Sequence, residues 1–145
     1  MKEIDRRDDI ELAFADSRVS MQLRGDASSS NVRVPTFEQG GGDYSKQLDM
    51  TVPHIFQISV AMTSAYAGTV AVYVDGSSTP IIGPLTTTNM QRTYVTGQDY
   101  VQFGENTNKA GVADLDWMIW TTQDAYTPAQ LQGKLPSGLG ITTGY

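Results

Sequence analysis

The chain has 145 residues, with 16 acidic residues against 10 Lys and Arg, one His and no Cys. The formal charge of −6 disfavours nucleic acid as a partner, because binding a phosphate backbone requires clustered cationic side chains. The missing Cys and the single His exclude disulfides, thiolate metal sites and a histidine metal cluster. The length and the low charged content of 18% favour one turn-rich β domain.

The first ten residues, MKEIDRRDDI, are predicted to form a flexible N-terminal arm, because a charged terminus has little surface to bury. They contain no apolar stretch of the kind found in signal peptides, and no 18 consecutive apolar residues occur in the chain. We therefore expect no signal peptide in this chain and no membrane insertion.

Between residues 11 and 37, apolar and polar residues alternate, which predicts short strands. One face of these strands carries Leu12, Phe14, Val19, Met21, Leu23, Val32 and Val34. Residues 39–46, QGGGDYSK, are predicted to be a loop. A phosphate-binding loop is disfavoured there, because the Lys-Ser/Thr ending before a helix and a βαβ context are both missing.

Residues 51–76 predict a β-hairpin with one apolar face. Ala67-Gly68 is the predicted turn, and Asp75-Gly76 ends the second strand because these residues accept the backbone angles of turns. The predicted inward residues are Phe56, Ile58, Val60, Met62, Val70, Val72 and Val74. The outward residues include Gln57, Ser59, Tyr73 and Asp75.

After this hairpin, residues 85–89 are predicted to be a Thr-rich connection, followed by strands at 91–96 and 100–103. Residues 114–120, DLDWMIW, predict a further strand with Leu115, Trp117 and Ile119 on one face and Asp116 and Trp120 on the other. Thr127 followed by Pro128 predicts one short helical turn at 127–132.

About eight short strands with almost no helix predict an all-β fold, an antiparallel β-sandwich. We expect the sandwich domain to span residues 11–132, between the N-terminal arm of residues 1–10 and an extended, Gly- and Pro-rich C-terminal tail of residues 133–145. Its predicted core consists of Phe56, Ile58, Val60, Val70, Val72, Val74, Leu115, Trp117 and Ile119.

Four motifs between residues 51 and 131 carry a family resemblance. They are Thr51-Val52-Pro53-His54, Val72-Tyr73-Val74-Asp75-Gly76, Val101-Gln102-Phe103-Gly104, and the 114–120 strand with Ala125-Tyr126-Thr127-Pro128. In their order and spacing they resemble the concanavalin A-like lectin and glucanase superfamily, in particular its laminin-G-like members. The resemblance implies a jelly roll of two curved antiparallel sheets packed face to face.

Glucanases of that superfamily use an E-x-D-x-x-E carboxylate cluster, which this chain does not match. Asp114 and Asp116 lie roughly 6.5 to 7 Å apart by strand rise, but Met118 stands where a third acid would be needed. His54 lies at a strand entrance, and no G-x-S-x-G elbow is present to supply a nucleophile. We therefore expect the protein not to be an enzyme.

The outward side chains suit a sugar, whose C–H faces stack on aromatic rings while its hydroxyls need polar partners. The candidate ligand-binding residues are Tyr73, Asp75, Asp116 and Trp120. An alternative for Trp120 is burial beneath a loop or tail, as for most large aromatic residues. No cofactor is expected except calcium, whose weak candidate ligands Asp75, Glu105, Asn106 and Asn108 serve equally well as turn formers.

The sequence therefore predicts a non-catalytic binding module that recognises surface glycans or a partner protein, at an extracellular, cell-surface or virion location. The alternative is a structural virion or surface-assembly protein with the same fold, such as a capsid decoration or tail-fibre component in a homo-oligomer or viral lattice. The charged arm and the Gly- and Pro-rich tail favour this alternative, because extended ends gain order on a neighbour's sheet edge.

Overall fold

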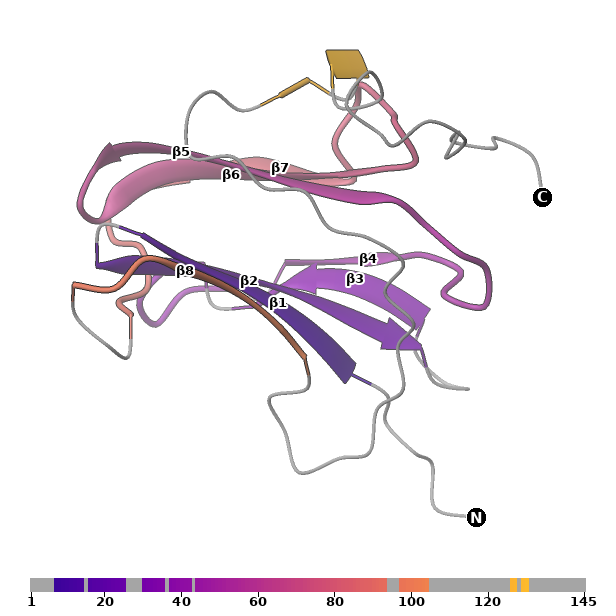
Figure 1. The fold of residues 1–145 in the computed structure, drawn as a ribbon, viewed down its shortest axis with the longest axis horizontal. Coiled ribbons are helices and arrows are strands. Elements are labelled where there is room, and N and C mark those ends of the chain that lie inside the picture. Colours follow the sequence, from indigo (N-terminus) through magenta and orange to yellow (C-terminus); the bar gives the residue numbers. More distant parts are fainter. Residues whose placement is uncertain are drawn as a thin grey trace, which may run out of the picture.

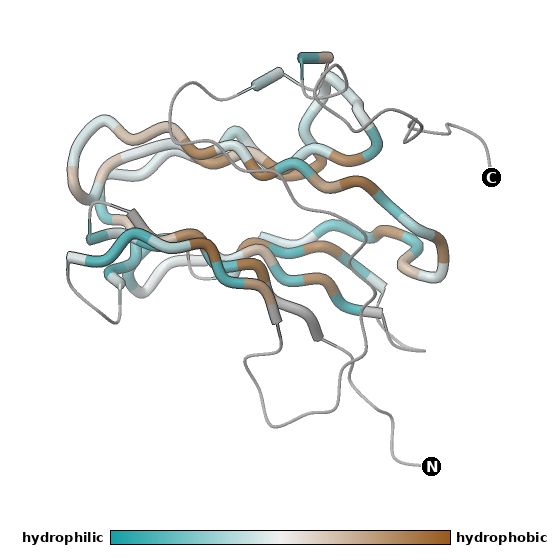
Figure 2. Tube along the Cα trace, in the orientation of Figure 1, coloured by the Kyte–Doolittle hydropathy of each residue, from teal (hydrophilic) through white to brown (hydrophobic). Residues whose placement is uncertain are grey.

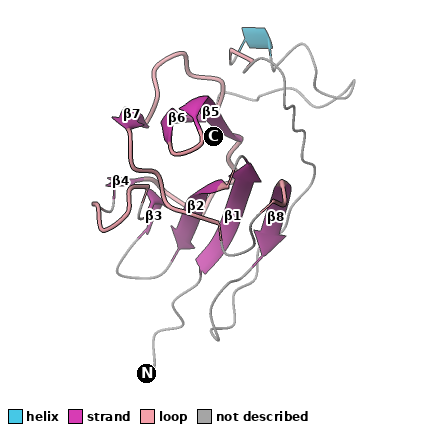
Figure 3. Ribbon diagram, turned by 90° about the vertical axis from the view of Figure 1, so that its left-hand side faces the viewer, coloured by secondary structure: helices cyan, strands magenta, loops and turns pink. Residues whose placement is uncertain are grey.

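The computed structural model describes residues 7–14, 16–25, 30–35, 37–42, 44–93, 97–104, 126–127 and 129–130. These residues form eight strands: β1 (Arg7–Phe14), β2 (Ser17–Gly25), β3 (Ser30–Val34), β4 (Tyr44–Gln47), β5 (Phe56–Ser64), β6 (Ala67–Val74), β7 (Ile82–Thr87) and β8 (Tyr100–Gly104). They build two antiparallel sheets, one in the order β4-β3-β2-β1-β8 and one in the order β5-β6-β7. The sheets lie one above the other (Figures 1 and 3), which confirms the predicted all-β sandwich.

The core lies between the two sheets because each sheet turns its apolar positions toward the other. Figure 2 shows hydrophobic and hydrophilic residues alternating along the strands, the period of a sheet with one buried face. Each buried Val contributes about 1.5 to 3 kcal/mol relative to an exposed one. The core cluster consists of Val19, Met21, Val32, Val34, Phe37, Val70, Val72, Ile82 and Met90.

The predicted core is confirmed on β6, where Val70, Val72 and Val74 are buried. Their partners on β5 also face inward, but are only partly buried against the cluster; these are Phe56, Ile58 and Val60. The other predicted core residues, Leu115, Trp117 and Ile119, lie outside the described residues. Phe37 and Met90 were not predicted, because both lie outside strands, where alternation gives no signal.

Some predicted boundaries are wrong. Strand β1 begins at Arg7 and lies between β2 and β8, so residues 7–10 belong to the sheet and not to an arm. The predicted loop at 39–46 contains the first three residues of the edge strand β4. The predicted connection at 85–89 begins inside β7. Only part of the predicted strand at 91–96 is described, and that part forms one isolated bridge, between Arg92 and Ser17.

The hairpin turn also differs from the prediction, since Ser64 pairs with Ala67 and the turn is Ala65-Tyr66. Gly68 is not part of the turn but lies inside β6. A Cβ at this position would lie 2.7 to 3.2 Å from surrounding atoms, including the Ala61 carbonyl oxygen at 2.7 Å and the sulfur of Met62 at 3.1 Å. Close packing, and not turn geometry, therefore requires glycine here.

A polar contact joins the two sheets at one end of the sandwich, and two more hold the crossing segment at the other end. At one end the Ser17 hydroxyl on β2 donates to the Ala65 carbonyl in the β5–β6 turn. At the other end, where the chain crosses from β4 to β5, the Ser30 hydroxyl donates to the Leu48 carbonyl (2.6 Å) and accepts from the Met50 amide (2.7 Å). The segment that joins the sheets is thus fixed at its start.

The predicted helical turn is described at residues 129–130, which are helical. The Thr127 hydroxyl accepts a hydrogen bond from the Gln130 amide (3.2 Å), and the Gln130 side-chain oxygen accepts one from the Thr127 amide (2.8 Å). This reciprocal pair is a capping box. Within the described residues, no helix is long and apolar enough to cross a membrane.

Candidate functional site

The outer face of the three-stranded sheet carries Tyr73, one of the predicted ligand-binding residues. Since Val72 and Val74 point into the core, Tyr73 points away from it, directly opposite Gln57 on β5. Ser59 and Ala71 form the next cross-strand pair on the same face. Tyr73 is half-buried, and its hydroxyl hydrogen-bonds to none of the residues that the structure describes.

Gln57, beside Tyr73, joins this face to a distant part of the chain. Its side-chain amide nitrogen donates to the Tyr126 carbonyl, 69 residues further along the chain. Its side-chain oxygen is buried, and no described residue donates a hydrogen bond to it. A buried acceptor without a donor is unusual in a folded protein.

Asp75, the second predicted ligand-binding residue, follows β6 and is engaged in structural contacts. Its Oδ1 accepts from the Ile55 amide (2.9 Å), its own amide donates to the Ile55 carbonyl (2.8 Å), and its Oδ2 lies 2.8 Å from His54 Nδ1. It adopts a left-handed backbone conformation (φ 54°), which Asp tolerates better than most residues. Asp75 therefore holds the entrance of β5 against the end of β6.

His54 completes this contact and closes the loop before it. Its Nε2 lies 2.8 Å from the Asp49 carbonyl oxygen, and its ring packs edge-on against Phe56 with 5.9 Å between centroids. Its side chain is only 9% exposed. Both ring nitrogens thus face oxygen atoms at hydrogen-bonding distance, so neither is left to take a proton from a nucleophile.

The carboxylate of Asp49 stabilises the turn at the start of the same loop. Its Oδ1 accepts hydrogen bonds from the Thr51 hydroxyl (2.6 Å) and the Thr51 amide (3.0 Å). These bonds, the hydroxyl first, lower the pKa of Asp49 below its ordinary value. The ionised form that makes them is therefore present at neutral pH and is lost only under acidic conditions.

The remaining predicted site residues, Asp116 and Trp120, lie outside the described residues, as do Glu105, Asn106 and Asn108. Of the candidate calcium ligands only Asp75 is described. In the described part of the chain, no three His, Asp or Glu side chains converge as a metal site would require. Calcium therefore stays a prediction.

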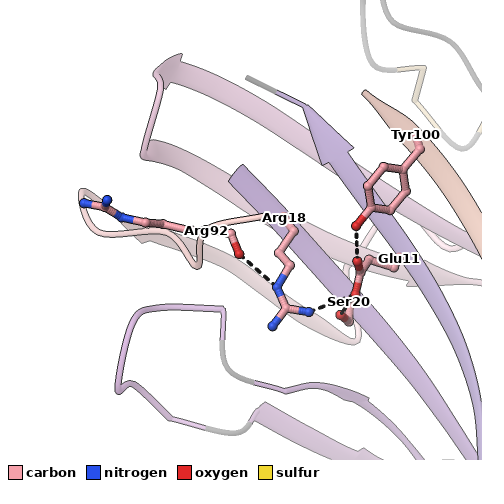
Figure 4. A network of polar contacts seen from close by, with 5 residues as sticks. All are labelled: Glu11, Arg18, Ser20, Arg92 and Tyr100. Carbon is pink, nitrogen blue, oxygen red and sulfur yellow. Dashed lines mark hydrogen bonds and ion pairs between the residues drawn. The ribbon is translucent and has the colours of Figure 1, made fainter. Parts of the chain in front are cut away.

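A second polar cluster lies on the outer face of the five-stranded sheet and was missed from the sequence (Figure 4). Glu11 on β1 is its centre. Glu11 Oε2 accepts from Arg18 Nη1 (3.0 Å) and the Ser20 hydroxyl (3.3 Å), and its Oε1 accepts from the Tyr100 hydroxyl. Arg18 also donates from Nε to the Arg92 carbonyl (3.1 Å). Glu11 and Arg18 are each only 7% exposed.

The hairpin register explains this cluster. Glu11 pairs with Ser20, and Ala13 pairs with Arg18, so all four share the outer face. The available sequence signal was a carboxylate (Glu11) and a guanidinium (Arg18) on opposite sides of a turn near Asp16, but alternation alone did not show that they meet across the strand pair. Because three donors occupy the Glu11 carboxylate, the cluster is built for stability. The guanidinium of Arg92 points away from it (Figure 4) and lies 4.7 Å from the centroid of the Tyr66 ring.

Comparisons of the chain with protein-family models, with curated proteins and with solved structures found no match. The concanavalin A-like resemblance, and the jelly-roll connectivity that it implies, therefore stay predictions.

Proposed function

We propose that the protein is a non-catalytic binding module that recognises a surface glycan on the outer face of the three-stranded sheet. The observation that carries this proposal is Tyr73, a half-buried aromatic residue on an outer sheet face, with a hydroxyl that no described residue engages. A tyrosine that stabilises a fold usually satisfies its hydroxyl internally. Among the described residues none engages the Tyr73 hydroxyl, so the ring and the hydroxyl are the groups that we assign to a ligand.

The neighbours of Tyr73 support a sugar as the ligand. Ser59 on β5 supplies a hydroxyl on the same face, and Ala71, which pairs with Ser59, adds no bulk beside the ring. Sugar recognition combines an aromatic surface for the C–H face with polar groups for the hydroxyls. A partner protein is the alternative ligand for the same face, and the experiment below distinguishes it from a glycan.

The structural roles of the acid–base groups among the described residues support a non-catalytic module. His54 and Asp75 hold the entrance of β5, and Glu11 is surrounded by three donors. A general acid or base must reach a substrate and exchange a proton with it. These groups are instead fixed by contacts within the fold.

The competing role is a structural component of a virion or surface lattice. Two of the sheet edges resist the strand addition by which such assemblies often form. Strand β4 carries Lys46, and β7 contains Pro84, which has no amide hydrogen to donate to an added strand. Assembly through these two edges is therefore disfavoured.

A glycan array probed with the multivalently displayed protein tests the proposal, because single-site sugar binding is weak and several copies raise the apparent affinity. We expect wild type to bind a defined set of glycans and Tyr73→Ala to bind them at least tenfold more weakly, a loss of about 1.4 kcal/mol. Tyr66→Ala is the matched control, since Tyr66 lies in the β5–β6 turn at the far end of β6.

Equal binding by wild type and Tyr73→Ala would refute the assigned surface. Binding to no glycan, together with a stable trimer or lattice in solution, would favour the structural role. If wild type captures one protein partner and Tyr73→Ala does not, the Tyr73 face is the binding surface but its ligand is a protein and not a glycan.

A further inference from the structure

Four strands end the two described sheets, and they differ in how well they are protected against pairing with a further strand. A sheet edge presents backbone N–H and C=O groups to which another strand can add, and proteins protect such edges with short strands, charged residues or proline. Strand β4 has four residues and includes Lys46, β8 has five residues, and β7 contains Pro84. Strand β5, which ends the three-stranded sheet (Figure 3), has nine residues without a charge, a proline or a glycine. It is therefore the least protected edge in the part of the chain that the structure describes.

The backbone of β5 directs every second residue away from β6. The Ile55 carbonyl, one residue before β5, accepts a hydrogen bond from the Asp75 amide (2.8 Å), and bonded positions alternate along an antiparallel pair. The Val72 carbonyl on β6 accepts from the Ile81 amide (2.8 Å), so it faces the side of β7, as this alternation requires. Four residues of β5 therefore turn their N–H and C=O groups to the side where no described strand pairs with it. They are Phe56, Ile58, Val60 and Met62.

The same four residues carry apolar side chains that their own sheet covers only in part. The first three pair with buried valines on β6, whereas all four are themselves half-buried. Both strands face the same core, so the difference arises from position, since β6 has a strand on each side and β5 has one among the described strands. A strand added at this edge would remove the remaining apolar surface from water, which is favourable.

We propose that the β5 edge pairs with the β5 edge of a second copy of this chain, antiparallel and across a two-fold axis. Self-pairing brings no like charges together, because β5 carries none. With Val60 at the axis, Ile58 pairs with Met62 of the partner subunit, so that apolar residues meet on the inner face. A two-fold contact uses the same surface on both chains and closes after two copies. The product is a dimer and not a lattice.

This inference goes beyond the proposed function. A two-fold axis perpendicular to the sheet keeps both outer faces on one side, so the dimer presents two Tyr73 faces to the same surface. Two linked sites bind a multivalent surface more tightly than one, and this consequence alone rests on the glycan proposal. A monomer that binds glycans would refute the edge pairing and keep the glycan site, and a dimer that binds no glycan would do the reverse.

Sedimentation equilibrium of the full chain over a series of concentrations, combined with backbone amide hydrogen exchange measured by NMR, tests the pairing. We expect a concentration-dependent dimer, in which the amides of Ile58, Val60 and Met62 exchange about tenfold more slowly than in the monomer. The amides of the alternate residues, already bonded to β6, should change much less. A monomer at every concentration would overturn the proposal, and so would a dimer without this alternating protection.

Ile58→Pro and Ile58→Ala form a matched pair of variants. Both remove the apolar side chain, but only proline removes the N–H that bonds to the second copy. We expect Ile58→Pro to be monomeric at concentrations where Ile58→Ala is still dimeric. Equal dissociation constants for the two variants would overturn the pairing.

If Ile58→Pro does not fold by circular dichroism, Ala61→Lys replaces it. Ala61 is exposed near the proposed axis, so the variant brings two lysines close together and should weaken the dimer about tenfold. Thr86→Lys is its control, since it adds the same charge to the same sheet face at an exposed position on β7. Equal dimerisation of these two variants would overturn β5 as the interface.

Discussion

The Glu11–Arg18 ion pair shows how this chain buries charge on an outer sheet face. Each carboxylate oxygen has at least one donor, and Arg18 has a second acceptor in the Arg92 carbonyl. Burying a charge is unfavourable unless its partners replace the lost water. The pair is therefore held by its complete set of hydrogen bonds, and it should be sensitive to removal of one member.

Glu11→Ala is expected to lower the free energy of unfolding by about 3 to 5 kcal/mol, measured by urea denaturation, because Arg18 stays buried without its carboxylate. The double variant Glu11→Leu with Arg18→Met is the control. It removes both charges at similar volume and should recover most of the loss. A loss below about 1 kcal/mol in Glu11→Ala, the value typical of an exposed pair, would contradict the assigned burial.

The outward direction of Tyr73 is the part of the candidate site that the sequence predicted, because strict alternation over β6 fixes which side chains leave the core. The role of Asp75 could not be predicted in the same way. Its partner His54 lies 21 residues away, and their contact depends on the register of β5 against β6 and on the path of the chain before β5. Periodicity within one strand carries no information about either.

At the scale of elements, the segment that crosses from β4 to β5 is fixed at both ends. Ser30 holds its start at Leu48 and Met50, and Asp75 holds its end at Ile55. Between them, His54 reaches back to the Asp49 carbonyl. The crossing is therefore a rigid connection between the sheets.

Asp75→Ala is expected to lower the free energy of unfolding by about 1.5 to 3 kcal/mol, because it removes the carboxylate acceptor of Ile55 and His54. Asp75→Asn is the matched control, since Asn tolerates the left-handed backbone, keeps an acceptor for Ile55 and can donate to His54 Nδ1. If Asp75→Ala keeps full thermal stability but loses glycan binding, Asp75 is a ligand residue and not a structural one.

Strand prediction succeeded where alternation was long and failed where local chemistry interrupted it. Strands β5 and β6 alternate over eight or nine residues and were recognised. Strand β7 contains Gly83 and Pro84, and its register against β6 shifts between Val70 and Val72, so its pattern resembles a turn. Strand β4 is short and polar and lies at a sheet edge, where no burial enforces a pattern.

At the scale of the whole molecule, the sandwich could be predicted but its strand order could not. Strand β1 pairs with β8, about ninety residues later in the chain, and such pairing is set by packing and not by local pattern. The first residues of β1 were assigned to an arm because they are charged, yet they lie in the middle of a sheet. Charge predicts exposure of side chains better than it predicts the absence of a strand.

Two outer faces of different chemistry follow from this architecture. One presents Tyr73 among small and polar residues, and the other carries the buried Glu11–Arg18 cluster. Since the core occupies the inner faces, recognition of a large ligand falls to these outer faces or to the loops. We propose that the Tyr73 face is the surface that binds a glycan.

A backbone amide NMR titration with the strongest ligand from the glycan array tests this claim most directly. We expect chemical-shift changes concentrated at Gln57, Ser59 and Tyr73 on β5 and β6, with little change on β2 and β3. Changes confined to other residues, or none at ligand concentrations well above the dissociation constant, would contradict it.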